Sequence, residues 1–138
     1  MDNVREVALI LKSAHHLEIP VTFRAAGTSL SGQAVSESVL VVSGDAWKEY
    51  AVLDKGRKIR LQPGIIGAQA NRYLTPNGRK IGPDPASING AMIGGIAANN
   101  ASGMCCGSAQ KSYQTISSLR MVLADGTMLD TADAQSRE

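Results

Sequence analysis

Two segments of this chain combine glycine with hydroxyl and amide side chains, a composition that lets a ligand approach the backbone closely. The first, residues 24–33, reads Arg-Ala-Ala-Gly-Thr-Ser-Leu-Ser-Gly-Gln and follows an apolar run. Small residues let backbone N–H groups approach an anion closely, and Gly27 and Gly32 can adopt a positive φ. The Thr and Ser hydroxyls of the segment add further donors. Such a row of donors favours a diphosphate as its ligand.

The two common phosphate-binding loops do not match this segment. The pattern G-x-x-x-x-G-K-[ST] fails because Gly32 is followed by Gln33 rather than by lysine. The pattern G-x-G-x-x-G fails because no third glycine stands in register with Gly27 and Gly32. Taken alone, the segment therefore also fits a plain surface turn.

The second segment, residues 82–103, is almost free of charge and of bulky side chains, and Asp84 is its only ionisable residue. We expect a turn followed by a short helix of small residues, which would let a flat ligand lie directly against the backbone. Donors and acceptors for such a ligand come from Ser87, Asn99, Asn100 and Ser102. A tightly packed turn in the core is the alternative interpretation of the same composition.

Other residue types with catalytic or metal-binding potential are few. His15 and His16, the only histidines, fall near the end of a predicted helix and are interpreted as surface residues. Cys105 and Cys106 are adjacent, which disfavours an ordinary disulfide and falls short of the four thiolates of an iron–sulfur cluster. We interpret them as small buried apolar residues. Accordingly, no metal site and no catalytic residue is predicted, and Asp84, between two prolines, is assigned to a turn.

Length and charge narrow the class of protein. A chain of 138 residues corresponds to one domain or slightly less. Its 14 Lys and Arg against 12 Asp and Glu give a net charge of +2, without a basic run interleaved with aromatics, so no nucleic-acid partner is expected. No apolar stretch approaches the length of a membrane-spanning helix and no secretion leader is present, so the expected location is cytoplasmic.

Hydrophobic patterns in the first part of the chain predict a helix followed by two strands. Helical spacing of apolar residues covers residues 4–17, and Asn3 with Glu6 resembles a capping box at its start. Short apolar runs predict strands at residues 19–23 and 39–42.

In the second part, turn residues separate two predicted hairpins, which comprise residues 51–53 with 58–62 and residues 119–123 with 127–131. The sequence Asp125-Gly126 between alternating runs is a strong signal for the later hairpin. A second helix is predicted over residues 66–74, and the polar residues after Asp130 are expected to fray.

The two glycine-rich segments, in this order, resemble the FAD-binding domain of the vanillyl-alcohol oxidase/p-cresol methylhydroxylase type. This domain occurs in D-lactate dehydrogenases and in the flavin subunit of glycolate oxidase. Residues 24–33 resemble its first diphosphate loop, whereas residues 82–87, 93–95 and 99–103 resemble its second flavin-contacting segment. Residues 122–126 resemble the hairpin that follows, so the resemblance covers most of the chain.

The resemblance implies an α+β fold in which a small parallel βα subdomain, about residues 1–45, precedes a mixed or antiparallel sheet with short helices, about residues 46–138. FAD would lie between the two parts and accept hydride from the hydroxyl-bearing carbon of a 2-hydroxy acid. The residues that the resemblance assigns to FAD are Ala25, Ala26, Gly27, Thr28, Ser29, Gly32, Gln33, Pro85, Ser87, Gly94, Gly95, Asn99, Ser102 and Gly103.

The chain departs from this family at both ends. It lacks the strand that usually precedes the first helix, the Gly-Ser-Glu-Gly-Thr-type segment that completes the FAD pocket, and the substrate domain. We therefore expect a portion of a larger D-lactate-like or glycolate-like flavoenzyme, inactive alone, whose partners include that substrate domain and, as a candidate, an iron–sulfur module. The parent enzyme could be peripheral to the inner membrane. Two alternatives stay open: a UDP-N-acetylenolpyruvoylglucosamine reductase-type flavoprotein and a ligand-free structural or interaction module.

Overall fold

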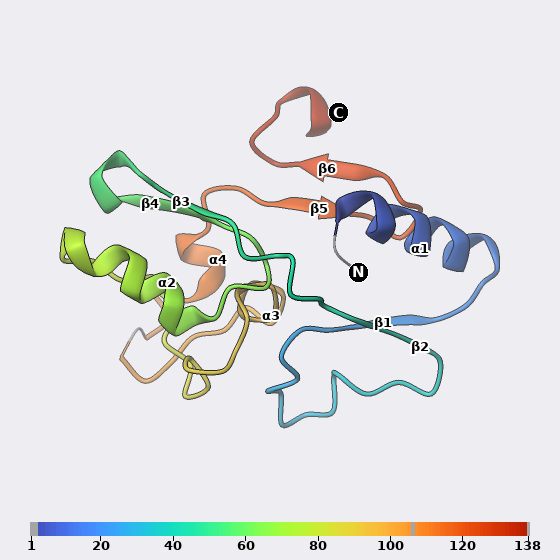
Figure 1. The fold of residues 1–138 in the computed structure, drawn as a ribbon, viewed down its shortest axis with the longest axis horizontal. Helices are drawn as coiled ribbons and strands as arrows, with labels where there is room; N and C mark the ends of the chain where they lie inside the picture. The colour runs from blue at the N-terminus through green and yellow to red at the C-terminus, as the bar shows by residue number, and fades with distance from the viewer. Residues whose placement is uncertain (1–2, 106, 138) are drawn as a thin grey trace.

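The computed structural model describes residues 3–105 and 107–137 and shows an α+β fold, as predicted. The two glycine-rich segments lie near its middle, between a hairpin–helix unit at one end and the first helix at the other (Figure 1). The elements in chain order are α1 (Val4–His16), β1 (Val21–Arg24), β2 (Val39–Val42), β3 (Tyr50–Leu53), η1 (Asp54–Gly56), β4 (Lys58–Leu61), α2 (Gly67–Leu74), η2 (Thr75–Asn77), α3 (Ile93–Ala98), α4 (Ser112–Thr115), β5 (Arg120–Val122), β6 (Met128–Asp130) and η3 (Gln135–Arg137).

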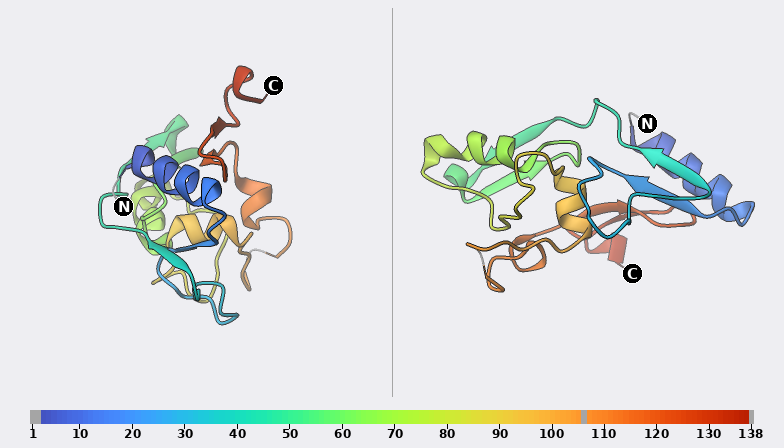
Figure 2. Two further views of the ribbon diagram at one scale, coloured as in Figure 1. Left: turned by 90° about the vertical axis from the view of Figure 1, so that its right-hand side faces the viewer. Right: turned by 90° about the horizontal axis from the view of Figure 1, so that it is seen from below.

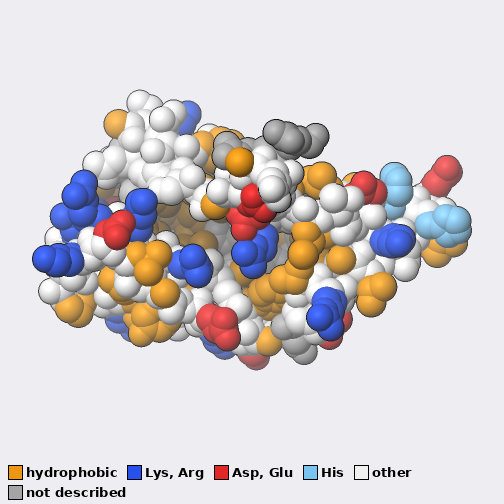
Figure 3. Space-filling view, turned by 90° about the horizontal axis from the view of Figure 1, so that it is seen from above, with side chains coloured by type: hydrophobic (Ala, Val, Ile, Leu, Met, Phe, Trp, Pro, Cys, Tyr) orange, Lys and Arg blue, Asp and Glu red, His pale blue; other side chains and the backbone are white. Residues whose placement is uncertain are grey.

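The predicted first helix is confirmed, and it ends one residue earlier than expected. Asn3 caps α1 because its side-chain oxygen accepts the Glu6 N–H at 3.0 Å while its amide donates to the Glu6 carboxylate at 2.8 Å. Both histidines are exposed at the far end of this helix, as predicted, and form the pale blue group in Figure 3.

Strands β1 and β2 pair in parallel, with Phe23 opposite Val41. β1 begins two residues later than predicted because the Ile19 N–H still bonds the helical carbonyl of Ala14, at 2.9 Å. The connection between the two parallel strands is the first glycine-rich segment and its continuation, residues 25–38. That segment therefore leaves the sheet at the carboxyl end of β1, where parallel strands commonly present ligand-binding loops.

The predicted hairpin β3–β4 is antiparallel, and α2 packs beside it, with the Tyr50 and Tyr73 rings stacked at 3.6 Å between centroids. In the described residues, β3–β4 and β5–β6 stay separate two-stranded sheets and do not join into one larger sheet. The β3–β4 hairpin and α2 form one end of the molecule, whereas α1 lies at the other (Figure 2).

The β5–β6 hairpin confirms the prediction from Asp125-Gly126. Gly126 adopts a φ of +86°, and the Thr127 N–H donates to the Asp125 carboxylate at 2.8 Å, which lowers the pKa of that carboxyl below its ordinary value. The tail beyond Asp130 was expected to fray, and this expectation was wrong. It forms the short helix η3, and the Ser136 hydroxyl accepts the Asp130 N–H at 2.9 Å.

Ile65, Ala70 and Ile96, at 0%, 0% and 4% exposure, form a buried core around α2 and α3, and Ala14 of α1 and Val41 of β2 are buried as well. The prediction of buried cysteines was wrong for Cys105, which is exposed because it lies in the solvent-facing connection between α3 and α4. Cys106 lies outside the described residues. None of the helices in the described part of the chain is long and apolar enough to cross a membrane.

Candidate functional site

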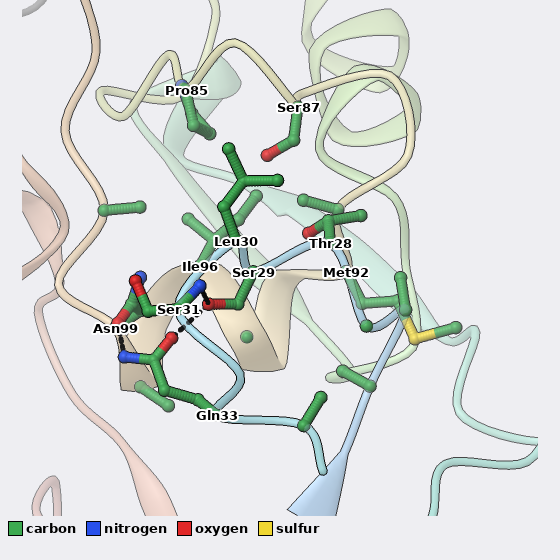
Figure 4. A pocket seen from close by; sticks show the side chains of 18 of the residues that line it. Thr28, Ser29, Leu30, Ser31, Gln33, Pro85, Ser87, Met92, Ile96 and Asn99 are labelled. Atoms are coloured by element: carbon green, nitrogen blue, oxygen red, sulfur yellow. Dashed lines mark hydrogen bonds between the residues drawn. The ribbon is translucent and has the colours of Figure 1, made fainter.

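A cavity of about 490 Å³ opens between the two glycine-rich segments, within the range of small-molecule pockets (Figure 4). Its walls come from the loop after β1 on one side and from the turn before α3 and α3 itself on the other. The lining residues are Phe23, Ala25, Ala26, Gly27, Thr28, Ser29, Leu30, Ser31, Gln33, Ala34, Pro85, Ser87, Ala91, Met92, Gly95, Ile96, Ala98, Asn99 and Ala101.

The first wall is a loop whose backbone donors are not used by the protein. Within residues 3–105 and 107–137, the backbone N–H groups of residues 26–30 donate to no protein acceptor. Gly27 and Gly32 adopt φ values of +67° and +71°, as their sequence context predicts. A run of unpaired N–H groups in a glycine-containing loop is the donor set of backbone anion sites.

Side-chain hydrogen bonds hold this loop in shape and join it to the second wall. The Ser29 hydroxyl donates to the Gln33 side-chain carbonyl and accepts the Ser31 N–H at 3.3 Å. The Gln33 amide in turn donates to the Asn99 side-chain oxygen at 3.3 Å (Figure 4). Gln33 therefore links two segments that are far apart in the sequence.

The second wall is fixed by the core. The Ile93 N–H donates to the Ile65 carbonyl at 2.8 Å, and the Gly94 N–H to the Pro63 carbonyl at 2.9 Å, so the start of α3 is tied to the chain before α2. Gly95 faces the cavity instead of the core. A methyl group at this position would lie 3.7 Å from the Ala25 Cβ on the first wall, which is an ordinary contact.

The structure brings together ten of the residues assigned to FAD from the sequence. These lining residues are Ala25, Ala26, Gly27, Thr28, Ser29, Gln33, Pro85, Ser87, Gly95 and Asn99. The other four, Gly32, Gly94, Ser102 and Gly103, do not line the cavity.

Three of those four residues have structural roles instead. A methyl group at Gly94 would lie 2.8 Å from the Pro63 Cβ, and one at Gly103 would lie 1.8 Å from the Asp84 carbonyl oxygen. The Ser102 carbonyl accepts the Asp84 N–H at 3.1 Å. These residues position the second wall without facing the ligand space.

The site assignment also missed lining residues, most of them apolar: Phe23, Leu30, Ser31, Ala34, Ala91, Met92, Ile96, Ala98 and Ala101. Met92, the N-cap of α3, and Ile96, within α3, are four residues apart, a spacing typical of one helix face that could have been used to find them. The lining contains no ionisable side chain, and the described residues contain no group of three or more His, Cys, Asp or Glu side chains that could hold a metal ion.

The family described as an FAD binding domain matches residues 1–132. The chain belongs to this family. Among curated relatives, it is 35% identical to glycolate oxidase subunit GlcD of Escherichia coli over 105 residues, which is 75% of this chain and 21% of that protein. It is 33% identical over 129 residues to D-lactate dehydrogenase of Archaeoglobus fulgidus, covering 93% of this chain and 29% of the relative.

A third relative, D-2-hydroxyglutarate dehydrogenase of Haemophilus influenzae, is 32% identical over 139 residues, covering 96% of this chain and 13% of that protein. The chain thus spans less than a third of each of these relatives. Among solved structures, 6-hydroxy-D-nicotine oxidase from Arthrobacter nicotinovorans superposes with a TM-score of 0.79 at 16% identity, over 94% of this chain and 28% of that one. This likeness supports the FAD-binding fold.

FAD is the cofactor of this domain, and two features of the cavity fit it. The unpaired N–H groups of residues 26–30 match the oxygen acceptors of a diphosphate. Small residues on both walls, such as Ala25 and Gly95, leave room for a flat ring system, and Ser87 and Asn99 supply side-chain donors and acceptors at the same cavity.

Proposed function

We propose that the cavity holds FAD with its diphosphate on the loop after β1, and that the chain is the flavin-binding part of an oxidoreductase of 2-hydroxy acids. The run of unpaired backbone N–H groups at residues 26–30, which line the cavity, carries the proposal. The three curated relatives act, by their names, on glycolate, D-lactate and D-2-hydroxyglutarate, which supports a substrate of the same class.

We assign a separate role in FAD binding to each group of residues at the site. The loop from Ala25 to Ser29, with Gln33, binds and orients the diphosphate, while Pro85, Ser87, Gly95 and Asn99 line the rest of the cofactor site. Gly32, Gly94, Ser102 and Gly103 act by shaping the two walls. Bound FAD supplies a hydride acceptor at its flavin ring.

Because the cavity lining offers no ionisable side chain, the base that takes the substrate proton and the groups that bind its carboxylate belong to other parts of the proposed enzyme. We assign the first wall to a subdomain of about residues 1–45 and the second to one of about residues 46–138. The cofactor site would then lie where the two subdomains meet.

Titration of the ¹⁵N-labelled chain with FAD, followed by NMR, tests the cofactor site even at weak affinity. We expect shifts concentrated in residues 25–34 and 85–101. Gly27→Val should abolish them while leaving the rest of the spectrum dispersed, because a β-branched residue resists a φ of +67° and its Cβ would collide with the Arg24 guanidinium beside the loop. Gly78→Val is the matched control, since Gly78 has a φ of +64° outside the cavity lining. Shifts confined to other parts of the chain would contradict the assignment.

The substrate class is tested in the protein that carries this chain, loaded with FAD. Anaerobic addition of D-lactate, glycolate or D-2-hydroxyglutarate should bleach the flavin absorbance with at least one of them, and an artificial acceptor should restore it. L-lactate is the stereochemical control for D-lactate. No bleaching with any 2-hydroxy acid would contradict this part of the proposal, and the 138-residue chain alone should give none.

A further inference from the structure

Arg24 ends β1 and directs its side chain along the loop that follows. Its carbonyl accepts the Ser43 N–H at 2.9 Å, which fixes the backbone at the end of the strand. A methyl group at Gly27 would lie 2.7 Å from Arg24 Nε and 2.8 Å from Nη2. The guanidinium thus occupies the space that any side chain at position 27 would need.

The Arg24 guanidinium has no charged or hydrogen-bonding partner among the residues that the structure describes. Arg24 is also exposed. A guanidinium presents N–H donors in a planar fork that matches phosphate oxygens. The side chain is therefore a cation with its donors available, held against a lining residue of the cavity.

The cavity itself supplies no charge to balance an anionic ligand. All of its lining side chains are uncharged, whereas a diphosphate carries negative charge that backbone dipoles neutralise only in part. Arg24 contacts Gly27, within the run of residues whose N–H groups are unpaired. The cation and the backbone donors thus converge on one loop.

We propose that Arg24 binds the diphosphate and makes the cavity selective for phosphate-bearing nucleotides over uncharged flavins. The inference rests on the proposed FAD site and adds a side chain that does not line the cavity. It also gives Gly27 a second role, because any larger residue at position 27 would displace the guanidinium from the loop.

Affinities of the ¹⁵N-labelled chain for ADP and for riboflavin, measured by NMR titration, test this inference. Arg24→Met keeps an apolar stem without charge, and Arg24→Lys keeps the charge without the fork. We expect Arg24→Met to weaken ADP binding by about tenfold, to reduce its salt dependence, and to leave riboflavin binding unchanged. Arg24→Lys should retain most of the ADP affinity. Arg57→Met, an exposed arginine on the distant β3–β4 hairpin, is the matched control and should change neither ligand.

Each contrary outcome has a distinct meaning. Equal losses in the Lys and Met variants, extending to riboflavin, would show that Arg24 only packs against the loop and would overturn the inference. Unchanged ADP affinity and salt dependence in Arg24→Met would overturn it while leaving the FAD site in place. A wild-type chain that binds riboflavin but not ADP would also overturn it, whereas binding of neither ligand would refute the FAD site and, with it, the role of Arg24.

Discussion

The two walls of the cavity use the same small residues for different purposes. The loop after β1 is exposed, with Leu30 at 102% exposure, and its glycines at positions 27 and 32 have positive φ. The second wall is tied to the core, with Ile96 at 4% exposure, and a methyl group at Gly94 or Gly103 would collide with neighbouring atoms. Glycine gives the first wall its shape and lets the second wall pack closely.

Because of this difference, we expect substitutions in the two walls to affect different properties, ligand binding in the first and stability in the second. Changes in the first wall should impair ligand binding with little effect on stability, because the loop makes few internal contacts. Changes in the second wall should lower the free energy of unfolding first, because its residues touch the core. The following four predictions test this contrast.

Gly103→Ala should have the largest effect on stability. Its methyl group would lie 1.8 Å from the carbonyl oxygen of Asp84, which is backbone and cannot move aside cheaply. We expect a loss of about 3 kcal/mol or more in the free energy of unfolding, measured by urea denaturation. Gly90→Ala is the control, because a methyl there makes ordinary contact at 3.8 Å with Thr28 and should change stability by no more than about 1 kcal/mol. Similar losses of unfolding free energy in Gly103→Ala and Gly90→Ala would show that close packing at Gly103 does not set the stability of the second wall.

Ser112→Ala should destabilise the second wall by a smaller amount. Ser112, at the start of α4, is 1% exposed, and its hydroxyl lies 3.0 Å from the Ile96 carbonyl of α3 and 2.9 Å from the Ala101 carbonyl. Both carbonyls also accept a backbone N–H, that of Ala101 for Ile96 and that of Ser112 for Ala101, at 2.9 Å each. Removal of the hydroxyl therefore costs only its own hydrogen bonding, about 0.5–1.5 kcal/mol in thermal or urea unfolding. Exposed Ser118→Ala should stay within about 0.5 kcal/mol of wild type. A neutral Ser112→Ala would show that the hydroxyl adds nothing to the backbone donors of these carbonyls.

Gly32→Ala should cost roughly 1 kcal/mol through backbone strain alone. No atom lies within 4 Å of a methyl group at this position, but its φ of +71° disfavours a side chain. Gly32→Asn should lose less stability in the same unfolding measurement, because asparagine tolerates the left-handed region. Equal stability of all three proteins would mean that the loop can rearrange freely.

Gln33→Ala should have the smallest effect on stability, no more than about 0.5 kcal/mol, because its hydrogen bonds are exposed. Its expected signature is local: the side-chain amide signals of Asn99 should shift toward solvent values as the bridge between the walls is lost. Unchanged Asn99 signals would indicate that the 3.3 Å hydrogen bond is not maintained in solution.

The sequence by itself determined the features that depend on near neighbours in the chain. The Asn3–Glu6 cap, the apolar spacing of α1 and the Asp125-Gly126 turn each involve hydrogen bonds or packing within a few residues, and all three were predicted correctly. The glycine-rich loop after β1 was predicted for the same reason, since Gly27 and Gly32 permit the positive φ that the loop adopts.

Only the tertiary structure decided the features that depend on distant segments. Sequence composition alone did not separate Gly95, which faces the cavity, from Gly94, which packs on Pro63, because the distinction depends on how α3 is anchored. The exposure of Cys105 and the contact of the Arg24 guanidinium with Gly27 likewise follow from how segments pack in space. Local propensities fix turns and helix ends through short-range hydrogen bonds, whereas the direction of a side chain depends on burial against residues far away in the sequence.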